Sequence, residues 1–99
     1  MGLGRELESE LHRPPAFAPG ARVRAEKLVR NDGTFAGREI GEVLARKGEE
    51  GYVRDIGTYL QRHYVYAVEF IASGHVVGML ARELISAGEE RTSEEEGRP

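Results

Sequence analysis

The three histidines are the residues of this 99-residue chain with the most versatile chemistry, because imidazole binds metals and transfers protons near neutral pH. His12, His63 and His75 are far apart in the sequence, and only His12 has a nearby carboxylate, that of Glu10. No pair has the spacing of a zinc motif. The chain has no cysteine, which excludes a disulfide, a thiolate zinc site and an iron–sulfur cluster held on its own thiolates. We therefore expect no metal, no cofactor and no catalytic residue.

A polar run in the first half of the chain is better suited to binding another protein. Asn31, Asp32, Gly33 and Thr34 form the clearest turn, because Asn and Asp side chains bond to nearby backbone N–H groups and glycine tolerates positive φ. The run can serve as a turn only, or also as a recognition loop beside Phe35. A calcium site is not expected, since no series of acidic ligands follows at loop spacing.

A second polar run lies some twenty residues later. Arg54 and Asp55 are expected to point outwards and to pair with residues 30–32 of the first polar run. The pairing can act as a brace that fixes the segment around the first run, or the residues can form part of a partner-binding surface. Arg and Tyr are common at interface hot spots. The predicted partner-binding patch consists of Asn31, Asp32, Thr34, Arg54, Asp55, Thr58 and Tyr59.

Residues 51–70 are the segment that must position these side chains. Both of its ends are rich in β-branched and aromatic residues, which predicts two antiparallel strands around a connection containing Gly57 and residues 61–63. Side chains alternate between the two faces of a strand, and Glu69 marks the wetter face. We therefore predict that Tyr66, Val68 and Phe70 face the core.

Another strand is expected after Gly20, with Val23 and Ala25 pointing inwards and a bulge or bend near Leu28. Residues 35–50 are the least regular part of the chain. Apolar residues at helical spacing permit a short helix there, but glycines interrupt it. We expect a long arm with one helical or extended turn.

The end of the fold is expected to be a strand over residues 75–80, followed by one helical turn over residues 81–85. Leu84 and Ile85 would then close the end of the sheet. Short strands, tight later hairpins and a terminal turn are typical of a small curled sheet. The predicted fold class is mainly β: a small SH3-like antiparallel barrel with a short terminal helical turn and flexible tails.

Composition divides the chain into three parts. Residues 1–19 are predicted to be a flexible or partly helical extension, residues 20–88 the barrel, and residues 89–99 a disordered acidic tail. The barrel has ten Lys and Arg against nine Asp and Glu, so its near-neutral charge argues against nonspecific binding to nucleic acid. A secretory signal and a membrane span are both lacking, which predicts a soluble cytoplasmic protein.

Several motifs occur together, in order, over about residues 19–86. They are Val23-Arg24, residues 30–35 with Gly37, Gly41, Gly48, residues 51–61, Tyr66-Ala67-Val68 with Phe70, and Val76-Val77-Gly78 with Glu83-Leu84. In these motifs the chain resembles the NifZ family of nitrogen-fixation accessory proteins. The resemblance implies an SH3-like fold and a non-enzymatic role in assembling the P-cluster of the nitrogenase molybdenum–iron protein. The implied partner is that protein in its immature form, or another nitrogen-fixation assembly protein, with no nucleic acid or membrane involved.

The chain departs from the family pattern at two positions. Met79 follows Val-Val-Gly where the family often has cysteine, and Ala36 replaces a frequent proline. The first departure excludes a cluster held on the protein's own thiolates, and the second suggests a looser arm. Two other functions remain open: an SH3-like module that binds nucleic acid, and an accessory subunit of an iron–sulfur enzyme.

Overall fold

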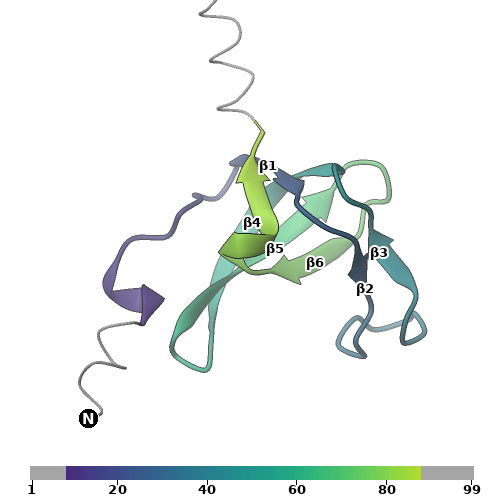
Figure 1. The fold of residues 1–99 in the computed structure, drawn as a ribbon, viewed down its shortest axis with the longest axis horizontal. Helices are drawn as coiled ribbons and strands as arrows, with labels where there is room; N and C mark the ends of the chain where they lie inside the picture. Colours follow the sequence, from purple (N-terminus) through teal and green to yellow (C-terminus); the bar gives the residue numbers. More distant parts are fainter. Residues whose placement is uncertain (1–8, 88–99) are drawn as a thin grey trace, which may run out of the picture.

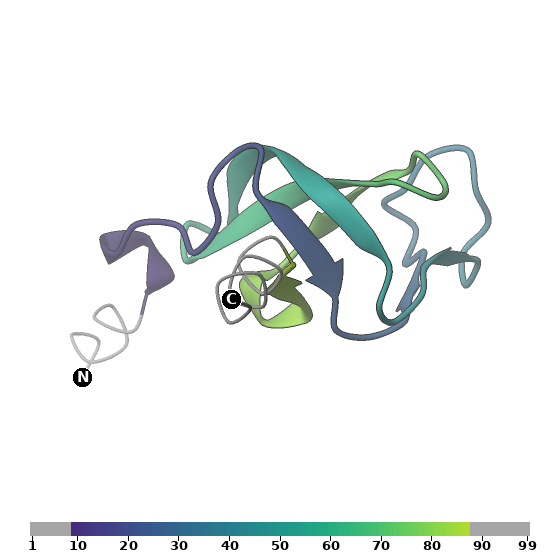
Figure 2. The ribbon, with the colours of Figure 1, turned by 90° about the horizontal axis from the view of Figure 1, so that it is seen from above.

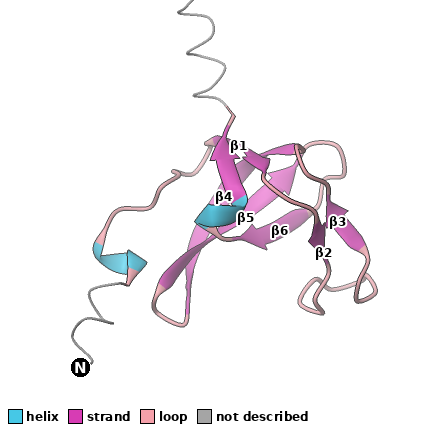
Figure 3. Ribbon diagram, in the orientation of Figure 1, coloured by secondary structure: helices cyan, strands magenta, loops and turns pink. Residues whose placement is uncertain are grey.

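The structure is a computed structural model, and it describes residues 9–87. This part of the chain is built almost entirely from short strands, with two single-turn 3₁₀ helices (Figures 1 and 3). The elements are η1 (Glu10–His12), β1 (Arg22–Ala25), β2 (Val29–Arg30), β3 (Val43–Ala45), β4 (Glu50–Tyr59), β5 (His63–Phe70), β6 (Val76–Met79), η2 (Ala81–Glu83) and β7 (Leu84–Ser86).

The strands form two antiparallel sheets. Five strands lie in the order β6-β5-β4-β1-β7, and β2 pairs with β3 in a separate two-stranded sheet. The prediction of a mainly β, antiparallel fold is therefore confirmed. The described strands do not form a closed barrel, because the two sheets are not hydrogen-bonded to each other along β6 and β2.

The β4–β5 pair carries the centre of the core, as expected. Tyr66, Val68 and Phe70 are all fully buried, and Val53 pairs with Val68 across the ladder. Gly57 was expected in the connection, but it lies within β4 and pairs with β5. The ladder extends past this residue because glycine pairs through the same backbone groups as any other residue.

Strands β1 and β7 show one confirmed prediction and one correction. Val23 and Ala25 of β1 point into the core, as predicted. The expected helical turn is shorter, since η2 ends at Glu83 and Leu84 starts β7 instead. The pairing of β7 with β1 explains the difference, because strand hydrogen bonds to the free side of β1 replace further helical ones.

The arm over residues 35–50 adopts the extended alternative. Val43–Ala45 form β3, and the chain before it is a series of turns rather than a helix. Gly41 has a φ of +90°, which is incompatible with a helix. Ile40, one of the apolar residues at helical spacing in this segment, is 78% exposed.

The described residues before Gly20 pack against the sheet. Within the predicted extension, only η1 is helical among the described residues, and residues 1–8 lie outside them. The Tyr66 hydroxyl accepts a 2.9 Å hydrogen bond from Ala16 N–H, and the Phe17 ring lies edge-on to the Tyr66 ring at 5.3 Å. Figure 2 shows this segment and the irregular arm at opposite ends of the molecule. The predicted tail, residues 89–99, also lies outside the described part.

A candidate partner-binding groove

Asn31 is the buried polar centre of the predicted turn, with 2% of its surface exposed. Its Oδ1 accepts hydrogen bonds from the N–H groups of Gly33 at 2.9 Å and Phe35 at 3.1 Å. Its Nδ2 donates to the carbonyls of Phe35, Arg38 and Glu39. The side chain therefore replaces the regular backbone pairing that this arm lacks, and it holds the turn in one shape.

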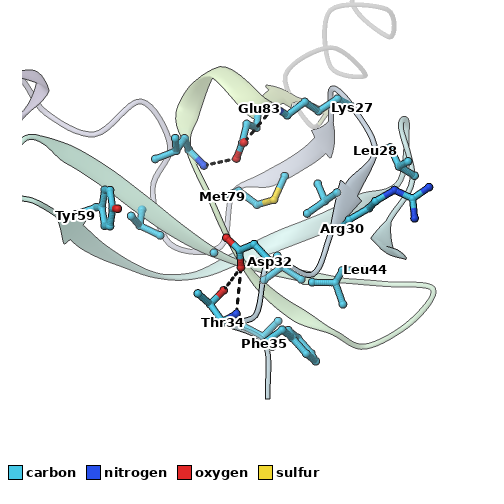
Figure 4. Close-up of a pocket in the computed structure, with 16 residues that line it drawn as sticks. Lys27, Leu28, Arg30, Asp32, Thr34, Phe35, Leu44, Tyr59, Met79 and Glu83 are labelled. Carbon is cyan, nitrogen blue, oxygen red and sulfur yellow. Dashed lines mark hydrogen bonds and ion pairs between the residues drawn. The ribbon is translucent and has the colours of Figure 1, made fainter. Parts of the chain in front are cut away.

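Asp32 lies on the outside of the same turn. Its Oδ1 accepts hydrogen bonds from the Thr34 hydroxyl at 2.7 Å and the Thr34 N–H at 3.1 Å (Figure 4). The bond from the hydroxyl, and then that from the N–H, lowers the pKa of the Asp32 carboxyl below its ordinary value of 3.8. Asp32 is therefore a fixed negative charge at neutral pH.

A groove of about 630 Å³ starts at this turn and follows β6. In Figure 4, Met79 lies between Tyr59 on one side and Leu28 on the other, with Asp32 and Thr34 below. The lining residues are Lys27, Leu28, Val29, Arg30, Asp32, Thr34, Phe35, Leu44, Tyr59, Val65, Val76, Val77, Gly78, Met79, Leu80 and Glu83. Val76 and Val77 belong to opposite faces of β6, so the groove must run along the edge of that strand.

The groove has balanced charge. Lys27 and Arg30 come from the β2 side, and Asp32 and Glu83 oppose them. The Glu83 carboxylate is already engaged, since Oε2 lies 3.5 Å from the Lys27 ammonium and Oε1 accepts the Leu80 N–H at 2.9 Å. Arg30 donates one hydrogen bond, from Nη1 to the Gly41 carbonyl. A guanidinium has five N–H donors, so Arg30 has further donors to offer.

The structure divides the seven residues of the predicted patch. Asp32, Thr34 and Tyr59 line the groove, and Asn31 lies buried behind the turn. The other three, Arg54, Asp55 and Thr58, are exposed on β4 and do not line it.

The predicted pairing between the two polar runs is not formed. Arg54 instead pairs with Glu69 on β5 at 2.9 Å, and Asp55 accepts a hydrogen bond from its own neighbour, Ile56. The reason is the strand order, because β5 and β6 separate the middle of β4 from the groove. Only Tyr59, at the end of β4, extends far enough to reach it.

Sequence reasoning missed the apolar part of the groove. Val65 and Val76 were treated as ordinary strand residues and Leu28 as part of a bulge or bend, yet Leu28 is 41% and Val76 is 42% exposed. One signal was available, since a strand with Val76 and Val77 apolar on both faces needs contacts on both. The pattern could not show that one long edge of the strand stays open.

No three His, Cys, Asp or Glu residues within residues 9–87 are grouped so that they could hold a metal ion. His75 lies 3.0 Å from the Arg38 guanidinium, and His63 lies 3.7 Å from the Glu10 carboxylate. Among the helices in that range, neither is long and apolar enough to cross a membrane.

Comparison with known proteins identifies the family. The NifZ domain family matches residues 14–86. A NifZ-type protein of Sinorhizobium fredii is 59% identical over 88 residues, covering 89% of this chain and 82% of the relative. Protein NifZ of Azotobacter vinelandii is 45% identical over 73 residues, covering 74% of this chain but 46% of the relative. No solved structure matches. The chain belongs to the NifZ family, whose members are associated with nitrogen fixation.

Proposed function

We propose that this protein is a non-enzymatic accessory factor that binds the immature molybdenum–iron protein of nitrogenase and assists maturation of its P-cluster in the cytoplasm. Membership of the NifZ family carries the proposal. The cysteine-free sequence agrees with it, because such a chain cannot hold a cluster on thiolates of its own. The client protein must then supply the cluster ligands, and this protein must act on the client through its surface.

The mechanism that fits such a surface is selective binding. A binding protein shifts the equilibrium of its client only as far as it prefers one conformation over another. We propose that the groove and its rim bind the conformation of the client in which the site of the P-cluster is open. The buried Asn31 supports this role, since it fixes the turn that presents Asp32 and Thr34.

Deletion of the gene in the source organism tests the function. We expect the molybdenum–iron protein purified from the deletion strain to have a reduced P-cluster content, measured by metal analysis and by spectroscopy of the clusters. Complementation with the wild-type gene should restore it. Full cluster loading in the deletion strain would rule out the proposed role.

A pair of double variants tests where the client binds. Asp32→Ala/Tyr59→Ala changes the groove, whereas Arg54→Ala/Asp55→Ala changes the exposed middle of β4. All four side chains are exposed, so both variants should fold. A site confined to the groove predicts weaker capture of the immature client by the first variant alone. Weakening by both would extend the site over the whole patch, and weakening by neither would place it elsewhere.

A further inference from the structure

β6 has an edge with no strand beside it among the described residues, because it is the terminal strand of its sheet. The Phe70 N–H donates to the His75 carbonyl at 2.9 Å, which makes these residues a hydrogen-bonded pair of the β5–β6 ladder. Such pairs alternate with non-bonded ones along an antiparallel ladder. The N–H and C=O groups of Val76 and Gly78 therefore point away from β5, towards the open edge.

β2 forms the opposite wall of the groove, and β3 is the one strand that pairs with it among the described residues. The Asn31 N–H donates to the Glu42 carbonyl at 2.8 Å, so that pair is hydrogen-bonded. Arg30, which pairs with Val43, then turns its backbone groups away from β3. Residues of β2 and β6 line the same groove, and Figure 1 shows both strands on the same side of the molecule. The groove therefore lies where the two sheets are not hydrogen-bonded to each other.

We propose that the groove binds an extended segment of the client protein as an additional strand along β6, between β6 and β2. This inference rests on the proposed function and specifies how the client is bound. An open strand edge offers alternating N–H and C=O groups, which only another extended backbone can satisfy in full. The apolar lining on both faces of β6 would receive side chains from both faces of the added strand.

The charges of the groove indicate what the segment should carry. The oxygens of Glu83 are engaged with Lys27 and Leu80, and Oδ1 of Asp32 is engaged with Thr34. Lys27 and Arg30 retain N–H donors beyond these contacts, and a guanidinium binds a carboxylate with two parallel hydrogen bonds. The complementary segment is therefore apolar and extended, with an Asp or Glu opposite β2.

Hydrogen exchange of the full chain, alone and with purified immature molybdenum–iron protein, tests the inference. In the free protein the amides of Val76 and Gly78 should exchange fast, and those of Val77 and Met79 slowly. In the complex, the two fast amides should become protected. Val76→Pro removes an outward N–H without touching the ladder to β5, and proline is tolerated on strand edges. This variant should bind the client at least about tenfold more weakly.

The outcomes separate the two proposals. If the wild-type protein fails to bind the client, the proposed function is wrong. If it binds while the amides of Val76 and Gly78 remain unprotected, the function stands and strand addition is overturned, whether or not Val76→Pro folds. Protection of these amides already in the free protein would also overturn strand addition by the client. If dilution removes the protection, a second copy covers the edge of β6. If deletion of residues 88–99 removes it, the chain's own acidic end covers that edge.

Discussion

Two of the turns that place residues at positive φ in this molecule do so by different means. In the arm, Gly33 has a φ of +106° and the side chains of Asn31 and Asp32 bond to the backbone around it. At the tip of the β4–β5 hairpin, Leu60 and Gln61 both have a φ of +54°. That pattern is typical of a type I′ turn, which prefers Asn and Gly.

The first turn is stabilised by its own residues, and the second is imposed by its surroundings. Eight residues of β4 pair with β5, and the ladder continues to Tyr59 and His63. The Arg62 N–H closes the turn on the Tyr59 carbonyl at 3.1 Å, and the Arg62 carbonyl accepts the Glu10 N–H. Long-range pairing therefore holds Leu60 in a conformation that costs a non-glycine residue about 1–2 kcal/mol.

The largest expected effect is the loss of the buried side chain in the arm. Asn31→Ala leaves two N–H groups and three carbonyls without their partner, and we expect it to reduce the free energy of unfolding by about 3 kcal/mol. Urea denaturation measures this change. The neighbouring Asp32→Ala, in an exposed position, should cost much less. Equal losses in the two variants would show that the arm is not stabilised by Asn31.

The second effect concerns the glycine of the same turn. Gly33→Ala should reduce the free energy of unfolding by about 1–2 kcal/mol, because alanine rarely adopts positive φ. The added Cβ would lie 3.6 Å from Ile40, an ordinary contact, so the cost arises from the backbone. Gly57→Ala is the matched control, since no atom lies within 4 Å of its Cβ position. Thermal unfolding of both variants checks the difference, and an unchanged melting temperature for Gly33→Ala would contradict it.

The third effect has the opposite sign. Replacing Leu60 and Gln61 by Asn and Gly supplies the residues that the hairpin turn prefers, and should stabilise the protein by about 1 kcal/mol. The melting temperature should then rise by about 4–8 °C for a domain of this size. Leu60→Ala serves as the control, because it removes the exposed side chain and keeps the strain. Stabilisation by the control alone would attribute the effect to the exposed leucine instead.

The smallest effect is the titration of Asp32. Its folded-state pKa lies below the ordinary value of 3.8, so its contribution to stability is complete above that pH and is lost as the pH falls through the folded-state pKa. Thr34→Val removes the hydroxyl donor and should move the pKa back towards 3.8. NMR titration of the Asp32 carboxyl measures this shift. An unchanged pKa in the variant would mean that the hydroxyl bond does not form in solution.

Local patterns predicted the strands that carry the core and the chemistry of the polar turn. Alternation correctly oriented Tyr66, Val68 and Phe70, because a strand with one buried face must place its large apolar residues on that face. Asn31 and Gly33 were recognised because their side-chain chemistry acts within a few residues. The extension of β4 through Gly57 and the formation of β7 were not predicted, since both depend on which strand lies alongside.

For the groove, the sequence pointed to Asp32, Thr34 and Tyr59 but placed them in one patch with Arg54 and Asp55. Strand order decided otherwise, because β5 and β6 separate the middle of β4, with Arg54 and Asp55, from the groove. Only the end of β4 brings Tyr59 to it. The sequence alone was sufficient to exclude thiolate chemistry and to orient the core, since composition and alternation act within one segment. Only the tertiary structure decided which edges remain open, because an unpaired edge is defined by the absence of a neighbour that may come from anywhere in the chain.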